Sequence, residues 1–313
     1  MLSRRAALAL LPAARVLSAA APRPVPTRRV TAWTSNPTPP ADGLPGLAAK
    51  IEGRDSRVVR LKSPADDLLL LIVLDVTGDL TLVDAARQAA AAEIDKLPPS
   101  SWAAVLRSQD GLRVLQDPTP DRPAVNNALL KAPVSGRAGL LETVEPAARL
   151  ATTLIRRTPI RTAVLYLTDS NIYNYREDYT NPVINMSDSR DLSRRFPDAL
   201  IREKSAKIAE ALAATDAPLF LVHLAFLRDR LNEAYQTGLQ QIAEATGGAA
   251  LFCRNVGDIP SSVTQAFAKI SSMWAIDLQI PPGSPKNLTI QLSSSAGDLQ
   301  YRTRLVLTGR GKE

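Results

Sequence analysis

The sequence predicts an α/β domain with a doubly wound, mostly parallel sheet, helices on both faces, and a small antiparallel β appendage at its C-terminal end. Two observations predict this fold. Apolar runs without alternation, typical of strands buried on both faces, are separated by segments with helical spacing. After Met273 the pattern changes to alternating apolar and polar residues, typical of half-buried antiparallel strands. Strands that alternate with helices favour a parallel sheet covered on both sides.

The predicted elements follow one another along residues 66–272. The first strand, 68–74, is an apolar run that ends at Asp75, and a helix over 80–97 is stopped by Pro98 and Pro99. The further predicted strands are 102–106, 111–115, 162–169, 218–224 and 249–253. The further predicted helices are 122–131, 140–156, 198–214, 229–245 and 258–271. Three alternating strands complete the chain at 274–280, 288–292 and 299–307.

The N-terminal residues predict export. Residues 1–20 combine Arg4 and Arg5 with a short apolar run and a small-residue segment, which is typical of a secretory signal peptide and predicts a periplasmic or secreted protein. The apolar run is too short to span a bilayer, so no membrane span is expected in the mature chain. Residues 21–65 are rich in proline and are predicted to be an extended linker. The α/β domain then covers 66–272, and 273–313 forms the β extension, too small for a core of its own.

Composition excludes several classes of function. The formal net charge is +7, but six basic residues precede Asp42, the first acidic residue, so residues 42–313 carry 7 − 6 = +1. A nearly neutral body gives no support for nucleic-acid binding. A single cysteine, Cys253, excludes an intramolecular disulfide and a cysteine-based metal site. The single histidine, His223, lies in an apolar strand and is expected to be buried and hydrogen-bonded. The sequence carries no phosphate loop and no nucleophile elbow.

Carboxylates follow two of the predicted strands. Asp75, Thr77 and Asp79 follow the first strand, and Asp169 ends a later one. Ligands in open α/β sheets bind beyond the carboxyl ends of the strands, so we expect these side chains to converge. Oxygen ligands of this kind suit Mg²⁺, Mn²⁺ or Ca²⁺, and without a cation one carboxyl group would be protonated. Mutual repulsion also predicts that Asp75→Ala leaves folding intact or increases stability.

Residues 66–272 resemble the von Willebrand factor type A family in the order of their elements and motifs: a strand, then Asp-x-Thr-x-Asp, a helix and a later Thr-Asp-Ser. The export signal and the β extension resemble the exported bacterial members of this family, which are abundant in acidobacteria. The resemblance implies a metal-ion-dependent adhesion site at Asp75, Thr77, Asp79 and Asp169. The site is degenerate, since Asp79 replaces a serine of the family motif and Ala138 stands at its threonine. The alternative is a relic site whose polar groups bond one another.

The loop that follows Asp169 predicts a function for the carboxyl edge of the sheet. Residues 170–197 form a long predicted loop after Asp169, with Tyr173, Tyr175 and Tyr179 and several arginines. Tyrosine and arginine are favoured at binding hot spots, so this loop, beginning at Ser170, is expected to contact a partner. The expected function is a binding module for an unidentified protein, and not an enzyme. The alternative is a metal-dependent, phosphoesterase-like hydrolase that uses Asp75, Asp79 and Asp169.

Overall fold

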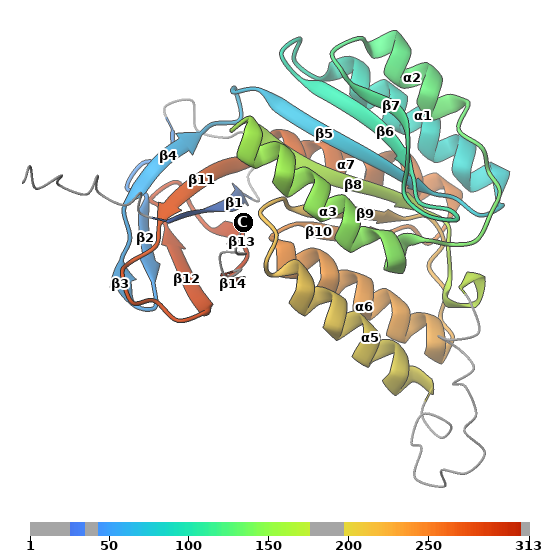
Figure 1. The fold of residues 1–313 in the computed structure, drawn as a ribbon. Helices are drawn as coiled ribbons and strands as arrows, with labels where there is room; N and C mark the ends of the chain where they lie inside the picture. Colours follow the sequence, from blue (N-terminus) through green and yellow to red (C-terminus); the bar gives the residue numbers. More distant parts are fainter. Residues whose placement is uncertain (1–25, 35–42, 176–196, 308–313) are drawn as a thin grey trace, which may run out of the picture.

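The computed structural model describes residues 26–34, 43–175 and 197–307, which form two modules (Figure 1). The α/β module covers 68–271. The β module is built from 27–62 and 274–306, so the α/β module is inserted between the two halves of the β module. Residues 1–20, the predicted signal peptide, lie outside the described residues, so export stays a prediction.

The α/β module has a single six-stranded sheet, and its fold class is as predicted. In spatial order its strands are β10 (Ala249–Phe252), β9 (Leu219–His223), β8 (Arg161–Thr168), β5 (Leu68–Asp75), β6 (Trp102–Arg107) and β7 (Arg113–Thr119). All neighbouring pairs are parallel except β6 and β7, which are antiparallel. The fully buried apolar runs of β5 and β8 occupy the centre, where both faces are covered.

Helices cover both faces of this sheet. One face packs against α1 (Leu80–Lys96), α2 (Arg122–Leu130) and α7 (Ile259–Ser271). The other packs against α3 (Leu140–Arg157), α5 (Pro197–Leu212) and α6 (Arg230–Thr246). Two short 3₁₀ turns, η1 (Ile172–Asn174) and η3 (Val256–Asp258), follow β8 and β10. The strands of a parallel sheet share one carboxyl edge, and this edge carries the loops after β5, β8 and β10.

The β module consists of two four-stranded sheets. The first has the order β13 (Leu299–Tyr301), β1 (Thr27–Thr34), β11 (Trp274–Gln279) and β4 (Val58–Lys62). The second has the order β14 (Arg304–Val306), β12 (Asn287–Ser293), β2 (Ala48–Ile51) and β3 (Arg54–Asp55). Strands from both halves of the chain enclose one apolar core, which includes Val30, Ile51, Trp274 and Ile290.

This architecture corrects two expectations about the chain ends. The segment 21–65 is not an extended linker, because 27–34 and 48–62 form strands. The C-terminal strands are not an appendage by themselves, because β1 pairs with β11 and β2 pairs with β12, so both sets of strands share one core. β1 (TRRVTAWT) mixes two arginines and three threonines with its apolar residues, and β2 and β4 are only four and five residues long, so no local pattern marked these strands. Pairing with strands more than 200 residues away supplies the partners that a lone short strand lacks.

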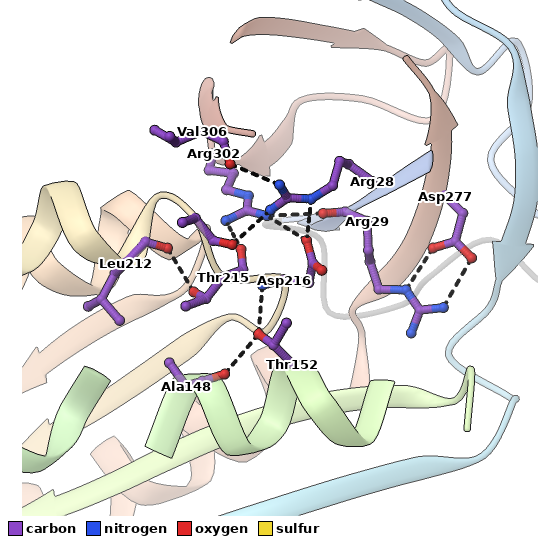
Figure 2. A network of polar contacts seen from close by, with 11 residues as sticks. Arg28, Arg29, Ala148, Thr152, Leu212, Thr215, Asp216, Asp277, Arg302 and Val306 are labelled. Carbon is purple, nitrogen blue, oxygen red and sulfur yellow. Dashed lines mark hydrogen bonds and ion pairs between the residues drawn. The ribbon is translucent and has the colours of Figure 1, made fainter. Parts of the chain in front are cut away.

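Buried ion pairs join the two modules. Arg28 of β1 donates to Asp216 at 2.8 Å, and Arg302 lies 3.7 Å from the same carboxylate (Figure 2). Arg29 pairs with Asp277 at 2.7 Å within the β module, and its guanidinium also donates to the carbonyl of Ile160 in the α/β module. A buried guanidinium or carboxylate group is stable only when it is paired and hydrogen-bonded. Because the arginines belong to the β module, and Asp216 and Ile160 to the α/β module, these contacts fix the relative position of the two modules.

Arg161, the first residue of β8, donates hydrogen bonds to both segments that connect the two modules. Its guanidinium donates to the carbonyls of Pro64 and Asp66 before β5, at 2.6 and 2.7 Å. It also donates to the carbonyls of Ser271 and Met273 between α7 and β11, at 3.1 and 3.3 Å. Arg161 is therefore a single side chain that ties both connections to the central sheet.

Candidate functional site

The two acidic strand ends meet, as expected. β5 and β8 lie side by side, with Asp75 opposite Thr168 in the parallel register. The backbone N–H of Asp169 donates to the carbonyl of Asp75 at 3.3 Å. The prediction that the loops after these strands share one edge of the sheet is confirmed.

Asp75 is the fully buried centre of a hydrogen-bond network. One carboxylate oxygen accepts from Ser108 Oγ at 2.6 Å and from the N–H of Gly139 at 2.8 Å. The other accepts from Ser170 Oγ at 2.7 Å and from Thr168 Oγ1 at 3.0 Å. Gly139 is the N-cap of α3 and offers no side-chain cap, so the carboxylate of Asp75 occupies the positive end of that helix.

Gly139 allows this contact because of its size. A Cβ atom there would lie 2.0 Å from the carbonyl oxygen of Ser108. The backbone at the N-terminus of α3 therefore lies so close to the loop after β6 that any residue other than glycine at this position would clash. This close approach brings the Gly139 N–H to the Asp75 carboxylate.

Hydroxyl groups surround the carboxylate of Asp75. Ser170 Oγ lies 3.2 Å from the hydroxyl of Tyr235, which lies 2.9 Å from that of Tyr175. Burial raises the pKa of both tyrosines. Burial also raises the pKa of Asp75, while its four hydrogen bonds act in the opposite direction. In the part of the chain that the structure describes, no lysine or arginine pairs with Asp75.

Asp169 occupies the beginning of α1. One of its carboxylate oxygens accepts from the N–H and the hydroxyl of Thr77, at 2.6 and 3.1 Å. The other accepts from the N–H groups of Gly78 and Asp79, at 3.1 and 3.2 Å. The loop that leads into α1 therefore presents its hydrogen-bond donors to an anion, the Asp169 carboxylate.

Asp79 does not join the other two carboxylates. Its exposed side chain is the N-cap of α1 and accepts from the N–H groups of Thr81 and Leu82 at 3.0 and 3.3 Å. The expectation that Asp75, Asp79 and Asp169 converge is thus wrong. The reason is that helix ends satisfy each carboxylate separately.

At this edge the protein's own donors occupy the carboxylates of Asp75 and Asp169. A carboxylate has about four lone-pair positions, and Asp75 and Asp169 each meet four protein donors. Ala138 is buried and adds no oxygen. No group of three or more His, Cys, Asp or Glu side chains among the described residues could hold a metal ion.

The expected partner-binding residues divide into buried and exposed ones. Ser170 and Tyr175 are buried in the network around Asp75, which corrects the expectation that they contact a partner. Tyr173 of η1 is 57% exposed, and its hydroxyl donates to Asp229 at 3.0 Å. Tyr179 and most of the 170–197 loop lie outside the described residues.

Two exposed apolar side chains at this edge were not foreseen. Leu80, the first residue of α1, is 59% exposed, and Val256 of η3 is 44% exposed. α1 and η3 are in contact, so the two residues belong to neighbouring elements. Single apolar residues in loops carry no periodic signal, and only the fold brings them to the same edge as Tyr173.

His223 is buried next to this network, as expected, and it predicts a pH dependence of stability. Its Nε2 lies 2.9 Å from the carbonyl oxygen of Ser170, and burial lowers its pKa from 6.5 to about 4. The unfolded chain binds the proton more tightly, so acidification favours unfolding. We expect this group alone to remove up to about 3 kcal/mol of stability between about pH 6.5 and pH 4.

Urea unfolding across this pH range checks the prediction with His223→Gln, which retains an N–H donor for Ser170. The variant is expected to lose less stability on acidification than the wild type. Because His223 is the only histidine, no other imidazole contributes. Parallel stability curves for the two proteins would contradict the assigned pKa shift.

Comparisons with known proteins find likeness only among solved structures. No family model matches the chain, and no curated protein matches it. A von Willebrand factor type A protein from Catenulispora acidiphila is 13% identical, with a TM-score of 0.46, and the match covers 91% of this chain and 74% of that one. Proximal thread matrix protein 1 from the mussel byssus, with a zinc-occupied MIDAS motif, is 13% identical at a TM-score of 0.44, over 69% and 48% of the two chains.

The VWA domain of SpRpn10 is 12% identical at a TM-score of 0.40, over 66% of this chain and 98% of that one. These similarities are too low to assign the chain to a family. Among the described residues, no helix is both long and apolar enough to cross a membrane.

Proposed function

We propose that this chain is a binding module of the von Willebrand factor type A kind that recognises a protein partner through its carboxyl edge, without a resident metal ion. The observation that carries the proposal is the exposure of Leu80, Tyr173 and Val256 at the start of α1, in η1 and in η3 of this edge. Each follows a different parallel strand, β5, β8 or β10. Exposed apolar side chains held on a rigid scaffold are typical of interaction sites.

The interior of the edge supports this role. The four donors to Asp75 come from the loop after β6, the N-terminus of α3 and the end of β8. The four donors to Asp169 come from the loop before α1. These bonds fix the segments after β5 and β8, which present Leu80 and Tyr173, so this part of the surface is organised before a partner binds. Pre-organisation of this kind lowers the entropic cost of association.

The proposal assigns no catalysis to the edge. The carboxylates of Asp75 and Asp169 already have full sets of donors, and that of Asp79 caps α1. No carboxylate pair is thus left to activate a water molecule. Partner recognition then depends on shape and apolar contact at the surface of the edge.

The test is quantitative capture from the protein's native cells. The bait is the full chain, compared with a Leu80→Asp/Tyr173→Ala/Val256→Asp variant and with a Val59→Asp variant. Val59 is 52% exposed on β4 of the β module and serves as the matched control. We expect the edge variant to lose a specific protein about tenfold or more, because apolar anchors of this size contribute about 1–2 kcal/mol each.

Capture in the presence of EDTA distinguishes the metal-free mode from an adhesion site that needs a cation. The proposal predicts equal capture with and without the chelator. Loss of capture in EDTA would refute the metal-free mode. Equal capture by the edge variant and the wild type would refute the assignment of the partner surface to this edge.

A further inference from the structure

A groove of about 790 Å³ lies between the two modules, away from the carboxyl edge. One wall is formed by the C-terminal halves of α5 and α6. The other is formed by β12 and by residues 302–306, which include β14 (Figure 1). Cavities of 300–1,000 Å³ at the junction of two structural units are common ligand sites. Because α5 and α6 begin at the carboxyl edge and run across the sheet, the groove is independent of the proposed partner surface.

The helical wall carries uncompensated negative charge. Glu210 and Glu244 lie in the last turns of α5 and α6, and neither forms an ion pair with a described residue. The last turns of both helices contain no basic side chain. The C-terminal end of a helix is its negative pole, so glutamates there increase the negative potential and favour a cationic neighbour. The Glu244 carboxylate accepts a hydrogen bond from the neutral amide of Gln240 at 2.9 Å.

The opposite wall carries excess positive charge. Arg28 and Arg302 share a single carboxylate, that of Asp216 (Figure 2). Arg302 is 2% exposed and lines the groove, donates to the carbonyls of Thr215 and Arg29, and leaves its Nε without a partner. Arg304 is exposed on this wall, and its side chain has no hydrogen bond or ion pair within the described residues.

We propose that this groove binds a short extended peptide segment that carries a basic side chain and an acidic side chain. The basic group faces Glu210 and Glu244, and the acidic group faces Arg304. The helical wall is lined by Ala206, Ala209 and Ala245, whose small side chains leave room for a main chain. Gln241 on one wall and Asn287 on the other offer amide groups that match the donors and acceptors of peptide bonds.

The test uses nuclear magnetic resonance of the ¹⁵N-labelled full chain with two probes. One is the capped peptide acetyl-Lys-Ala-Ala-Glu-amide, and the other is the uncharged acetyl-Gln-Ala-Ala-Gln-amide. We expect the charged peptide to shift groove amides saturably, with a Kd of about 1 mM. The charged peptide should bind about threefold to fivefold more weakly to Glu244→Gln or Arg304→Gln, because each variant removes one exposed charge interaction. The uncharged peptide removes both interactions and should bind the wild type about tenfold more weakly.

Glu233→Gln provides the control, since Glu233 is exposed on the first turn of the same helix, away from the groove. It should leave the affinity unchanged. No saturable shift of groove amides at about 10 mM peptide, about ten times the expected Kd, would overturn the proposal. Equal binding of the two peptides, or unchanged affinity in Glu244→Gln and Arg304→Gln, would overturn it as well. The result is separable from the proposed function, because the Leu80/Tyr173/Val256 variant should bind this peptide normally.

Discussion

Replacing Arg161 with methionine is expected to lower the free energy of unfolding by about 3 kcal/mol. Arg161 is 1% exposed and donates to four carbonyl groups in the two connections between the modules. Methionine fills a similar volume and leaves those carbonyls without their donor, at about 1–3 kcal/mol for each one that water cannot reach. Removal of the buried charge offsets part of this loss, because burial lowers the pKa of Arg161 to about 10.

Equilibrium unfolding in urea measures this effect, with Arg157→Met as the control. Arg157 is exposed in the last turn of α3, close in sequence, and its replacement should change stability by less than about 0.5 kcal/mol. The Arg161 variant should also unfold with separate transitions for the two modules, because their connections are no longer tied to β8. A loss below about 1 kcal/mol would show that the hydrogen bonds to the connections contribute little.

The second large effect is expected at Asp75. Asp75→Ala should cost about 3–4 kcal/mol, since four buried donors lose their acceptor and α3 loses the carboxylate at its N-terminus. This sign is opposite to the one expected from repulsion among three carboxylates. The structure separates those carboxylates, so no repulsion is relieved.

Asp79→Ala is the matched control for Asp75→Ala in thermal and urea unfolding. Asp79 is exposed and supplies only the side-chain cap of α1, so about 1 kcal/mol is expected. Asp75→Asn keeps the shape and part of the acceptor capacity and should fall between the two. Equal stability of Asp75→Ala and the wild type would contradict the assigned role of Asp75 as the centre of the edge.

Local pattern predicted the α/β module well. The runs 68–74 and 162–169 are buried strands and neighbours, because an uninterrupted apolar run is stable only when both of its faces are covered. The same reasoning failed for 27–34 and 48–62. Their strands are stabilised by partners at the other end of the chain, and no feature of a short window reports such a partner.

The residue types of the candidate site were also read correctly from the sequence, but their roles were not. Asp75 and Asp169 do lie at the same edge, as strand order predicts. Whether a carboxylate accepts protein donors or binds a cation depends on the directions of N–H and hydroxyl groups within a few ångströms. Those directions are set by the N-termini of α1 and α3 and by the close approach at Gly139.

By itself, the sequence determined the order of strands and helices from 66 to 272, because the spacing of apolar residues within each short segment indicates whether that segment is a strand or a helix. Only the tertiary structure decided that 27–62 and 274–306 form one β module, that Asp75 and Asp169 each accept four hydrogen bonds, and that Leu80, Tyr173 and Val256 are each exposed at one edge. These features depend on contacts between residues far apart in the sequence, and such contacts exist only after the layers have packed.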